Sequence, residues 1–308
     1  MADRPLLVLD SASLYYRSFY ALPESMTAPD GHPHNAIRGF LDTLAALIES
    51  YEPYGVVCAW DDDWRPAWRV ELLPSYKTHR VLEDSTDAEA EPDTLGPQIT
   101  GLAELLDAWG IARVGADGFE ADDVIATYAA RTATPVIAVT GDRDLFQVID
   151  DAASNTVLYT ASGGMSKWPM MDAAALVARY GVQPHQYVDF AVLRGDPSDG
   201  LPGVPGIGEK TAAALLGQHG SLEAIMAAIR GSYEKPLTPR LAEKLEDARS
   251  YIESARSVVT AVTDVPIGRR STRFAAQGRT QASAVIAEWG VVRSADRLER
   301  AIAQATST

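Results

Sequence analysis

The sequence has little of what marks a secreted or membrane protein. It holds one cysteine, Cys58, in 308 residues, so no intramolecular disulfide can form and a reducing compartment is its natural setting. No apolar run reaches the ~20 residues that a helix needs to span a bilayer. The start, MADRPLLVLD, places no cationic segment before its short apolar run, unlike a secretory signal. These absences exclude a disulfide-rich scaffold and favour a cytoplasmic globular protein with no membrane partner.

Basic residues are also scarce, and their scarcity is uneven. Residues 1–200 hold 13 Lys and Arg against 31 Asp and Glu, whereas residues 201–308 hold 14 against 11. The net charge of −15 taken alone argues against a nucleic-acid partner. The acidic excess, however, lies entirely in the first two thirds, which could bind metal cations, while the remainder is mildly basic.

Short apolar runs rich in Val, Leu and Ile alternate with amphipathic segments in the first half of the chain. We expect strands at 5–10, 55–61, 135–142 and 155–160, and helices at 35–51, 95–109 and 121–131. This alternation predicts an α/β fold with a mainly parallel central sheet covered by helices on both faces. Parallel sheets place their chemistry at the carboxyl ends of the strands, and the first three runs end in Asp10, Asp61 and Asp142.

Helical patterns dominate after residue 172. They cover 172–180, 185–194, 209–217, 221–230 and 238–254, with a last helix near 281–303. A strand-like run, SVVTAVTDVP, occupies 257–266, and the polar, acidic segment 81–94 is typical of an exposed connection. The Pro- and Gly-rich stretch 195–208 indicates a boundary between subdomains.

Carboxylates recur at predicted strand ends and turns. The motif GFEADD places three of them at a helix start, where one or two would already complement the helix dipole. The full set is Asp10, Asp61, Glu120, Asp122, Asp123, Asp142, Asp144, Asp196 and Asp199. If these groups converge, their repulsion requires cations, and oxygen ligands without a His or Cys cluster favour Mg²⁺ or Mn²⁺ over Zn²⁺. Two such ions about 4 Å apart can clamp the oxygens of a phosphoryl transfer.

The stretch GVPGIGEKTAAALL (203–216) fits the turn of a helix–hairpin–helix element. Gly203, Gly206 and Gly208 allow backbone conformations and close approaches that other residues do not. The following helix start offers N–H groups to a phosphate, with Lys210 and Thr211 as side-chain donors. Such contacts grip a nucleic-acid backbone without reading bases.

Taken in order, several blocks resemble one known family over nearly the whole chain: LVLDSASLYYRSFYALP (7–23), SYKTHR (75–80), GFEADD, TGDRDLFQ and LRGDPSDGLPGVPGIGEKTAAALL (193–216). The family is that of the 5′ nucleases, comprising flap endonucleases and 5′–3′ exonucleases such as the N-terminal nuclease domain of bacterial DNA polymerase I. The resemblance implies a stand-alone protein with a PIN-like core at 1–190, including a helical arch at about 76–98. It also implies a helix–three-turn–helix DNA-binding subdomain with C-terminal helices at 191–308, two Mg²⁺ or Mn²⁺ ions, and a K⁺ ion at 203–208.

Carried over residue by residue, the resemblance assigns all nine carboxylates to the metal set and gives Asp122 a catalytic role as well. Asp61 is the open case, because a gapless count back from Arg69 favours Asp62 whereas the strand end favours Asp61. At the arch base, the matches Tyr76, Lys77 and Arg80 suggest stacking on the scissile nucleotide and stabilisation of charge there. Tyr16 and Arg17 match positions near the entering strand. Lys77 and Arg80 are the expected catalytic cations.

The implied activity is metal-dependent, structure-specific hydrolysis of DNA near duplex/single-strand junctions in replication and repair. Its expected partners are DNA with a 5′ flap or 5′ end, RNA primers, and a DNA polymerase or ligase. We expect the protein to be a monomer and to act at the nucleoid of a bacterium. The alternative is a catalytically weak DNA-junction-binding module of the same fold. A third class, the phosphohydrolases of the haloacid-dehalogenase type, is set aside. These enzymes need a second Asp two residues after the nucleophilic strand-end Asp, and position 12, two residues after Asp10, is Ala.

Three departures from the family pattern remove no carboxylate. Ser11 replaces the usual Gly, Arg143 the usual Lys and Gly200 the usual Asn. The arch stretch 83–93 is acidic where DNA would pass, which leaves open how the arch orders and threads a 5′ end.

Overall fold

A six-stranded sheet forms the centre of the computed structural model, which describes residues 4–82, 85, 89, 92–161, 163–231, 233–268, 270–274 and 279–307. The strand order is β3-β2-β1-β4-β5-β6, for Ala112–Val114, Gly55–Ala59, Leu6–Asp10, Val136–Thr140, Thr156–Tyr159 and Met170–Met171. All neighbours are parallel except β5 and β6. The predicted mainly parallel α/β fold is therefore confirmed. Strands β3 and β6 were not predicted, because three and two residues carry too little pattern.

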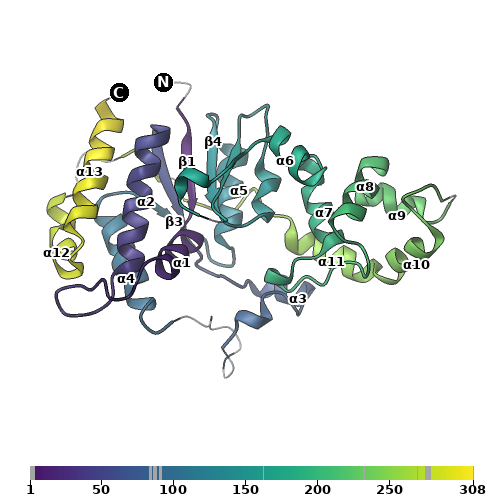
Figure 1. Ribbon diagram of the computed structural model, residues 1–308, viewed down its shortest axis with the longest axis horizontal. Helices are drawn as coiled ribbons and strands as arrows, with labels where there is room; N and C mark the ends of the chain where they lie inside the picture. Colours follow the sequence, from purple (N-terminus) through teal and green to yellow (C-terminus); the bar gives the residue numbers. More distant parts are fainter. Residues whose placement is uncertain are drawn as a thin grey trace.

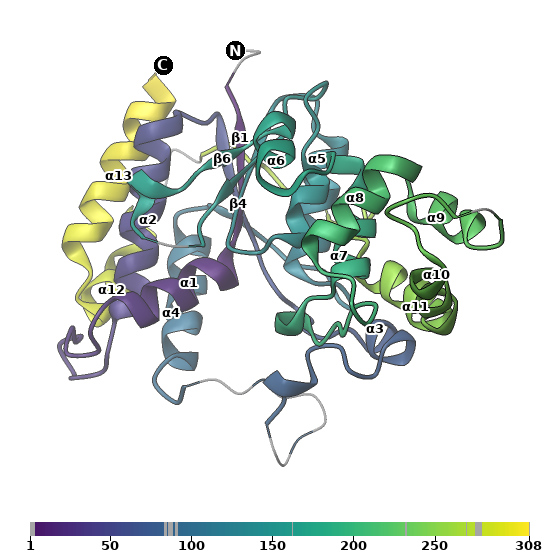
Figure 2. The ribbon, with the colours of Figure 1, turned by 45° about the vertical axis from the view of Figure 1, so that its right-hand side comes forward.

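Helices cover both faces of the sheet, as Figures 1 and 2 show. In β1, Leu6 and Val8 pack into one apolar cluster, whereas Leu7 and Leu9 pack into a second on the opposite face. The cluster on the first face includes α5 (Ala121–Arg131) and continues away from the sheet into the helices between residues 173 and 259. The second face carries α1 (Ser11–Ala21), α2 (Asn35–Tyr51) and α4 (Gly96–Ala108). Because alternate strand residues point to opposite faces, a strand with two covered faces must be apolar throughout.

Several helices begin and end where the sequence predicts. Helices α2 and α5 have the predicted bounds, and α4 differs by one residue at each end. The later helices α6–α9 are Ala173–Tyr180, Tyr187–Arg194, Glu209–His219 and Leu222–Ala228. Side-chain N-caps that satisfy free backbone N–H groups begin four helices; they are Asp10, Asp172, Ser221 and Thr238.

Three predictions for the C-terminal third were wrong in detail. The helix expected at 238–254 is two, α10 (Pro239–Asp247) and α11 (Arg249–Val259), which break at Ala248. The last helix is also two, α12 (Arg279–Trp289) and α13 (Val292–Ser307), separated by Gly290 at φ +64°. The run 257–266 is no strand, because it ends α11 and then hydrogen-bonds to α5, where the Thr127 hydroxyl donates to Val262 O at 3.2 Å.

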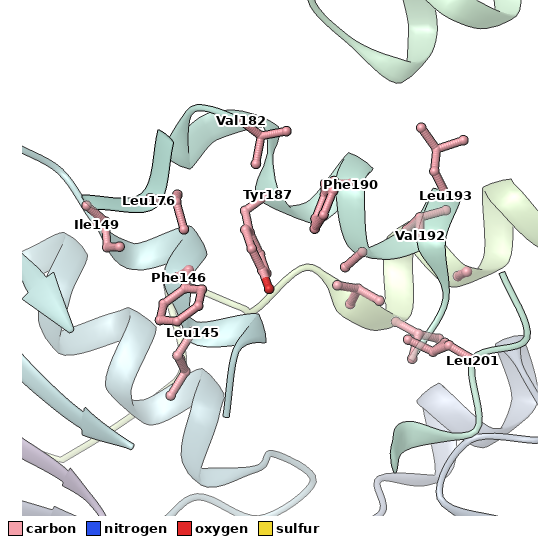
Figure 3. Close-up of a cluster of buried hydrophobic side chains, with 14 of the residues drawn as sticks. Leu145, Phe146, Ile149, Leu176, Val182, Tyr187, Phe190, Val192, Leu193 and Leu201 are labelled. Atoms are coloured by element: carbon pink, nitrogen blue, oxygen red, sulfur yellow. The ribbon is translucent and has the colours of Figure 1, made fainter. Parts of the chain in front are cut away.

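An aromatic cluster joins the sheet to the helices that carry the glycine-rich turn. The Phe146 ring of the 3₁₀ helix η2 (Asp144–Val148) lies 5.3 Å from the Tyr187 ring of α7, centroid to centroid, and 5.1 Å from Tyr159 of β5. Figure 3 shows Tyr187 facing Phe146, with Phe190 beside it. Both Phe146 and Tyr187 are fully buried, so this contact fixes α7 relative to the carboxyl edge of the sheet.

The last two helices return to the core. In chain order they belong to residues 191–308, but α13 packs along α2 and α12 along α4 (Figure 1). The Arg4 guanidinium donates to Ala305 O at 2.7 Å, so the two ends of the described chain meet at the amino edge of the sheet. Within the described ranges, no helix has the length and apolar character to cross a membrane.

The predicted arch region, 76–98, is described only in part. It contains the 3₁₀ helix η1 (Thr78–Arg80), which follows the short helix α3 (Ala67–Leu72), and the start of α4. Much of the acidic stretch 83–93 lies outside the described residues.

We expect Phe146→Ala to lower the free energy of unfolding by about 3–5 kcal/mol, because it removes a fully buried ring from between two others. Urea denaturation followed by circular dichroism measures the change. Val177→Ala, at a side chain 37% exposed on α6, is the matched control and should stay within about 0.5 kcal/mol. Equal losses in the two variants would contradict the role given to the cluster.

Candidate metal centre and nucleic-acid interface

Three carboxylates meet at the carboxyl edge of the sheet because their strands are neighbours. Asp10 ends β1, while Asp61 and Asp142 follow β2 and β4, which flank β1 on either side. Asp10 is oriented by the Ser13 N–H at 3.0 Å and the Thr140 hydroxyl at 2.7 Å. All three carboxylates line one cavity of about 330 Å³.

Eight of the nine predicted metal ligands line this cavity or a small one beside it. The larger cavity is lined by Asp10, Asp61, Glu120, Asp122, Asp142 and Asp196. The smaller one shares Glu120 and Asp122 with it and adds Asp144 and Asp199. The structure places Asp61 at the larger cavity, whereas the Asp62 carboxylate lies so close to Gly115 that a Cβ there would meet it at 2.4 Å.

Asp123 is the exception among the predicted ligands. It is fully buried, and Arg69 donates to both of its carboxylate oxygens at 2.8 Å. The N–H groups of Glu120 and Val262 donate to the same carboxylate at 3.1 and 2.8 Å. With every side of the carboxylate occupied, the structure gives Asp123 a structural role: it caps α5, neutralises Arg69 and holds the segment after α11.

Two side chains that were predicted to contact the nucleotide instead contact other parts of the protein. The Tyr76 ring is 5% exposed and its hydroxyl donates to Glu120 Oε2 at 2.7 Å, so this ring is not presented for stacking. Arg17 donates to the carbonyls of Thr160, at 2.6 Å, and Gly163, and it lies over the Trp168 ring. Tyr16, by contrast, does line the larger cavity.

Cations of the protein pair with the carboxylates at the rim of the site. Lys77 pairs with Glu120, and Arg80 donates to Asp199 at 3.0 Å; both cations line the larger cavity. Asp196 accepts from Arg143 and Arg194, each at 2.9 Å, and from Ser198. Burial opposes the charge of Asp196, but the Ser198 hydrogen bond and the two guanidinium groups outweigh it and lower the Asp196 pKa.

The central carboxylates have the opposite electrostatics. Burial first, and then the charge of Asp61, raises the pKa of Asp10 to about 7. Burial, together with the charges of Asp142 and Asp10, raises the pKa of Asp122 well above its usual value. The same causes, with Asp142 as the main neighbour, raise the pKa of Asp144. Each of these three groups is dehydrated and repelled by neighbouring carboxylates, which is unfavourable for an ionised carboxylate without a cation.

The residues present therefore fit divalent cations with oxygen ligands. Asp144 Oδ1 is buried without a hydrogen-bond partner in the described part of the chain, as expected of an oxygen available to a metal. Among the described side chains, no group of three acidic, His or Cys residues is already arranged to hold a metal ion.

The glycine-rich turn leads into helix α8, whose Glu209 lies 3.9 Å from Arg143, a residue that lines the larger cavity. Gly203 and Gly206 have φ values of +70° and +83°, which only glycine adopts readily, whereas Gly208 is an extended N-cap of α8. Lys210 is exposed and Thr211 half-buried in the first turn of α8. The Tyr251 hydroxyl accepts from Gly203 N–H at 2.9 Å and donates to Val192 O at 3.1 Å, which fixes the turn against α7 and α11.

Three residues of the site were missed by sequence reasoning. Arg69 serves as the buried cation between Glu120 and Asp123, Arg194 supports Asp196, and Tyr251 supports the turn. Each acts through a partner distant in sequence or through the backbone, so periodicity does not reveal it. A usable signal existed for Arg69, which ends the unusual block WDDDWRPAWR.

Comparisons with known proteins agree on one family. Residues 5–181 match the family described as 5′-3′ exonuclease, N-terminal resolvase-like domain, and residues 182–282 match 5′-3′ exonuclease, C-terminal SAM fold. A 5′-3′ exonuclease of Streptomyces coelicolor is 50% identical over 297 residues, which cover 95% of this chain and 98% of that protein. DNA polymerase I of Mycobacterium bovis is 38% identical over 275 residues, which cover 87% of this chain but 28% of the polymerase.

One solved structure extends the likeness to the fold. The bacteriophage T5 flap endonuclease, in a pseudo-enzyme-product complex with DNA and metal ions, superposes with a TM-score of 0.65 at 17% identity. The superposition covers 98% of this chain and 100% of the phage protein.

We expect Asp10→Asn to stabilise the metal-free protein. The folded pKa of Asp10, about 7, lies above its ordinary value of 3.8, so the folded state binds more protons between these pH values. Stability therefore falls as pH rises through this window. Asn cannot ionise and still caps the helix. In EDTA at about pH 8 the variant should be more stable by about 1–3 kcal/mol, with a smaller gain near pH 5.

Urea denaturation of the two proteins across this pH range measures the difference. A wild-type protein that is the more stable one at the higher pH would contradict the electrostatics described for the central carboxylates.

Proposed function

The chain belongs to the 5′–3′ exonuclease family and is a nuclease, and from this premise we propose that it is a divalent-metal-dependent, structure-specific 5′ nuclease. Its substrate would be DNA with a 5′ flap or a 5′ end at a duplex junction, as arises in replication and repair. The observation that carries the proposal is the meeting of eight carboxylates around two adjoining cavities. A glycine-rich turn leads into the exposed start of α8, which is linked to the larger cavity through Arg143 and Glu209.

Two groups of residues would hold the metal ions. Asp10, Asp61, Asp122 and Asp142, with Glu120, surround the larger cavity, and Asp144, Asp196 and Asp199 complete the set. Mg²⁺ or Mn²⁺ suits these oxygen ligands, and a pair of such ions supplies a hydroxide nucleophile and charge neutralisation when bound.

The protein's own cations and aromatic ring would then position the substrate. Lys77 and Arg80 line the larger cavity, where their charges favour a phosphate over a neutral group and stabilise charge that develops on it. Tyr16 lines the same cavity and offers a face to a nucleobase. Arg143, which lines the cavity too, reaches Glu209 of α8 at 3.9 Å and so links the site to the hairpin helix.

The turn at 203–208 would hold the duplex. The first N–H groups of α8, with Lys210 and Thr211 beside them, suit a backbone phosphate. A K⁺ ion bound by the turn would add a further positive charge there. In this arrangement residues 1–190 form the catalytic core, including an arch at about 76–98. Residues 191–308 add Asp196 and Asp199 to the metal-binding set and supply the hairpin helices that hold the duplex.

The proposal extends to the setting of the reaction. Because the chain is similar to part of a DNA polymerase I, action beside a DNA polymerase or ligase follows naturally, as does the removal of RNA primers. We further propose a monomer that works in the cytoplasm at the nucleoid of a bacterium.

Asp122→Ala should abolish cleavage while leaving junction binding in place, since Asp122 lines both cavities but lies away from the hairpin. A labelled 5′-flap substrate with Mg²⁺ or Mn²⁺ measures cleavage, and a gel shift in Ca²⁺ measures binding. A loss of at least about 1,000-fold is expected if metal positioning fails. Asp107→Ala, at an exposed aspartate of α4, is the matched control.

If the wild-type protein binds the flap but does not cut it with any divalent ion, the proposed nuclease activity is refuted. The alternative, a junction-binding module without catalysis, is then supported.

Lys210→Ala should weaken binding to junctions of every sequence by a similar factor. Loss of one phosphate contact reduces the slope of log K against log salt by about 1. Fluorescence anisotropy at several salt concentrations measures the slope. Arg300→Ala, at an exposed cation of α13 on the far side of the core, should leave it unchanged. An unchanged slope for the Lys210 variant would remove the hairpin from the DNA interface.

A further inference from the structure

Both carboxylate oxygens of Glu120 are occupied by protein donors. Oε2 accepts from Arg69 Nη1 at 2.5 Å and from the Tyr76 hydroxyl at 2.7 Å, and Oε1 is paired with the Lys77 ammonium. Glu120 is 2% exposed, so water does not supply alternative partners. With all three donors in place Oε2 is filled, and a metal ion that binds Oε1 must share this oxygen with the Lys77 ammonium.

The three donors are not equally permanent. Arg69 is 2% exposed and is fixed by Asp123 at 2.8 Å and by Val258 O at 3.0 Å. The Tyr76 ring belongs to the apolar core. Lys77 alone among the three lines the larger cavity. In the described part of the chain its ammonium has two weaker contacts beyond Glu120, to Trp64 O at 3.5 Å and to the Tyr76 ring, whose centroid lies 5.1 Å away.

Resting on the function proposed above, we propose that Lys77 is an exchangeable counter-ion of Glu120. Its ammonium neutralises Glu120 in the metal-free protein, and a divalent cation that takes Glu120 Oε1 releases it into the cavity. Two cations compete for one carboxylate oxygen, so the protein itself sets the affinity for metal.

The backbone at Lys77 permits this exchange. Its N–H donates to Asp199 O at 3.0 Å, and its left-handed conformation, at φ +49°, places it at the start of η1. The main chain is thus anchored independently of the ammonium, and the long side chain can turn while the backbone stays. Once released, the ammonium remains in the cavity lined by Arg80, where a substrate phosphate would lie.

The competition predicts a direct effect on metal affinity. In protein freed of metal and DNA, we expect Lys77→Met to bind Mn²⁺ about 5- to 150-fold more tightly than wild type, the range of ordinary coupling between linked sites. Titration with Mn²⁺ followed by electron paramagnetic resonance measures it. Lys77→Arg retains a cation at the same place and should bind nearly as wild type does. Equal or weaker binding by Lys77→Met would overturn the proposal.

A double-mutant cycle separates the specific ion pair from a general loss of positive charge. In a Glu120→Gln background the partner of Lys77 is absent, and Lys77→Met should then leave Mn²⁺ affinity nearly unchanged. An increase as large as that in the wild-type background would show a general charge effect, and the exchange would be refuted. Circular dichroism of each variant verifies that it is folded.

A second measurement uses the unmodified protein. Because linkage is reciprocal, Mg²⁺ should expose the amine of Lys77, a residue that is 9% exposed without metal. A short pulse of acetic anhydride, read by mass spectrometry, should acetylate Lys77 several-fold faster in Mg²⁺ than in EDTA. Lys210, already exposed, is the internal reference and should change little. Equal labelling of Lys77 in the two conditions would contradict the release.

Both readouts are independent of cleavage. If Lys77 becomes exposed on metal binding but the protein cuts no DNA, the exchange is supported and the proposed nuclease activity is refuted. If the protein cuts DNA but Lys77→Met has unaltered Mn²⁺ affinity, the nuclease activity is supported and the exchange is refuted.

Discussion

Repulsion among carboxylates at the carboxyl edge of the sheet is the constraint around which the rest of this structure is arranged. The central group, Asp10, Asp122 and Asp144, has raised pKa values because its members are buried and because neighbouring carboxylates repel them. The outer group is neutralised by Lys77, Arg80 and the arginines around Asp196. Acids paired with cations of the protein thus surround acids that are buried without such a partner, and this arrangement favours a bound divalent cation.

The elements that create this edge also connect it to the rest of the chain. Arg69 joins α3 to the start of α5 and to the end of α11, and Asp123 holds the segment that follows. On the other side, the aromatic cluster around Phe146 sets α7, and Tyr251 sets the turn after it. A phosphate gripped at α8 would therefore lie at a distance from the cavity that is fixed by packed side chains. The cut would fall at a set distance from the held duplex.

Much of this arrangement was predictable from local pattern. Helices α2 and α5 have the predicted bounds because amphipathic spacing is visible within one segment. Asp10, Asp61 and Asp142 were predicted at one edge because each ends a run that begins with an apolar strand pattern. The breaks at Ala248 and Gly290 were missed, since a hydrophobic pattern continues across a short turn. The placement of Asp61 over Asp62 depends on the fit against Gly115, and the diversion of Asp123 depends on Arg69, 54 positions earlier. Packing between distant segments decides such cases, and no window of sequence contains them.

The meeting of Arg4 with Ala305 has a practical meaning for handling the molecule. Both ends of the described chain lie at the amino edge of the sheet, with the full length of the strands between them and the carboxylates (Figure 1). An anchor at either end would thus hold the protein at the amino edge of the sheet and leave the carboxyl edge, with its carboxylates, facing solution. Immobilised in this way, single molecules could be offered long DNA without the support blocking its approach.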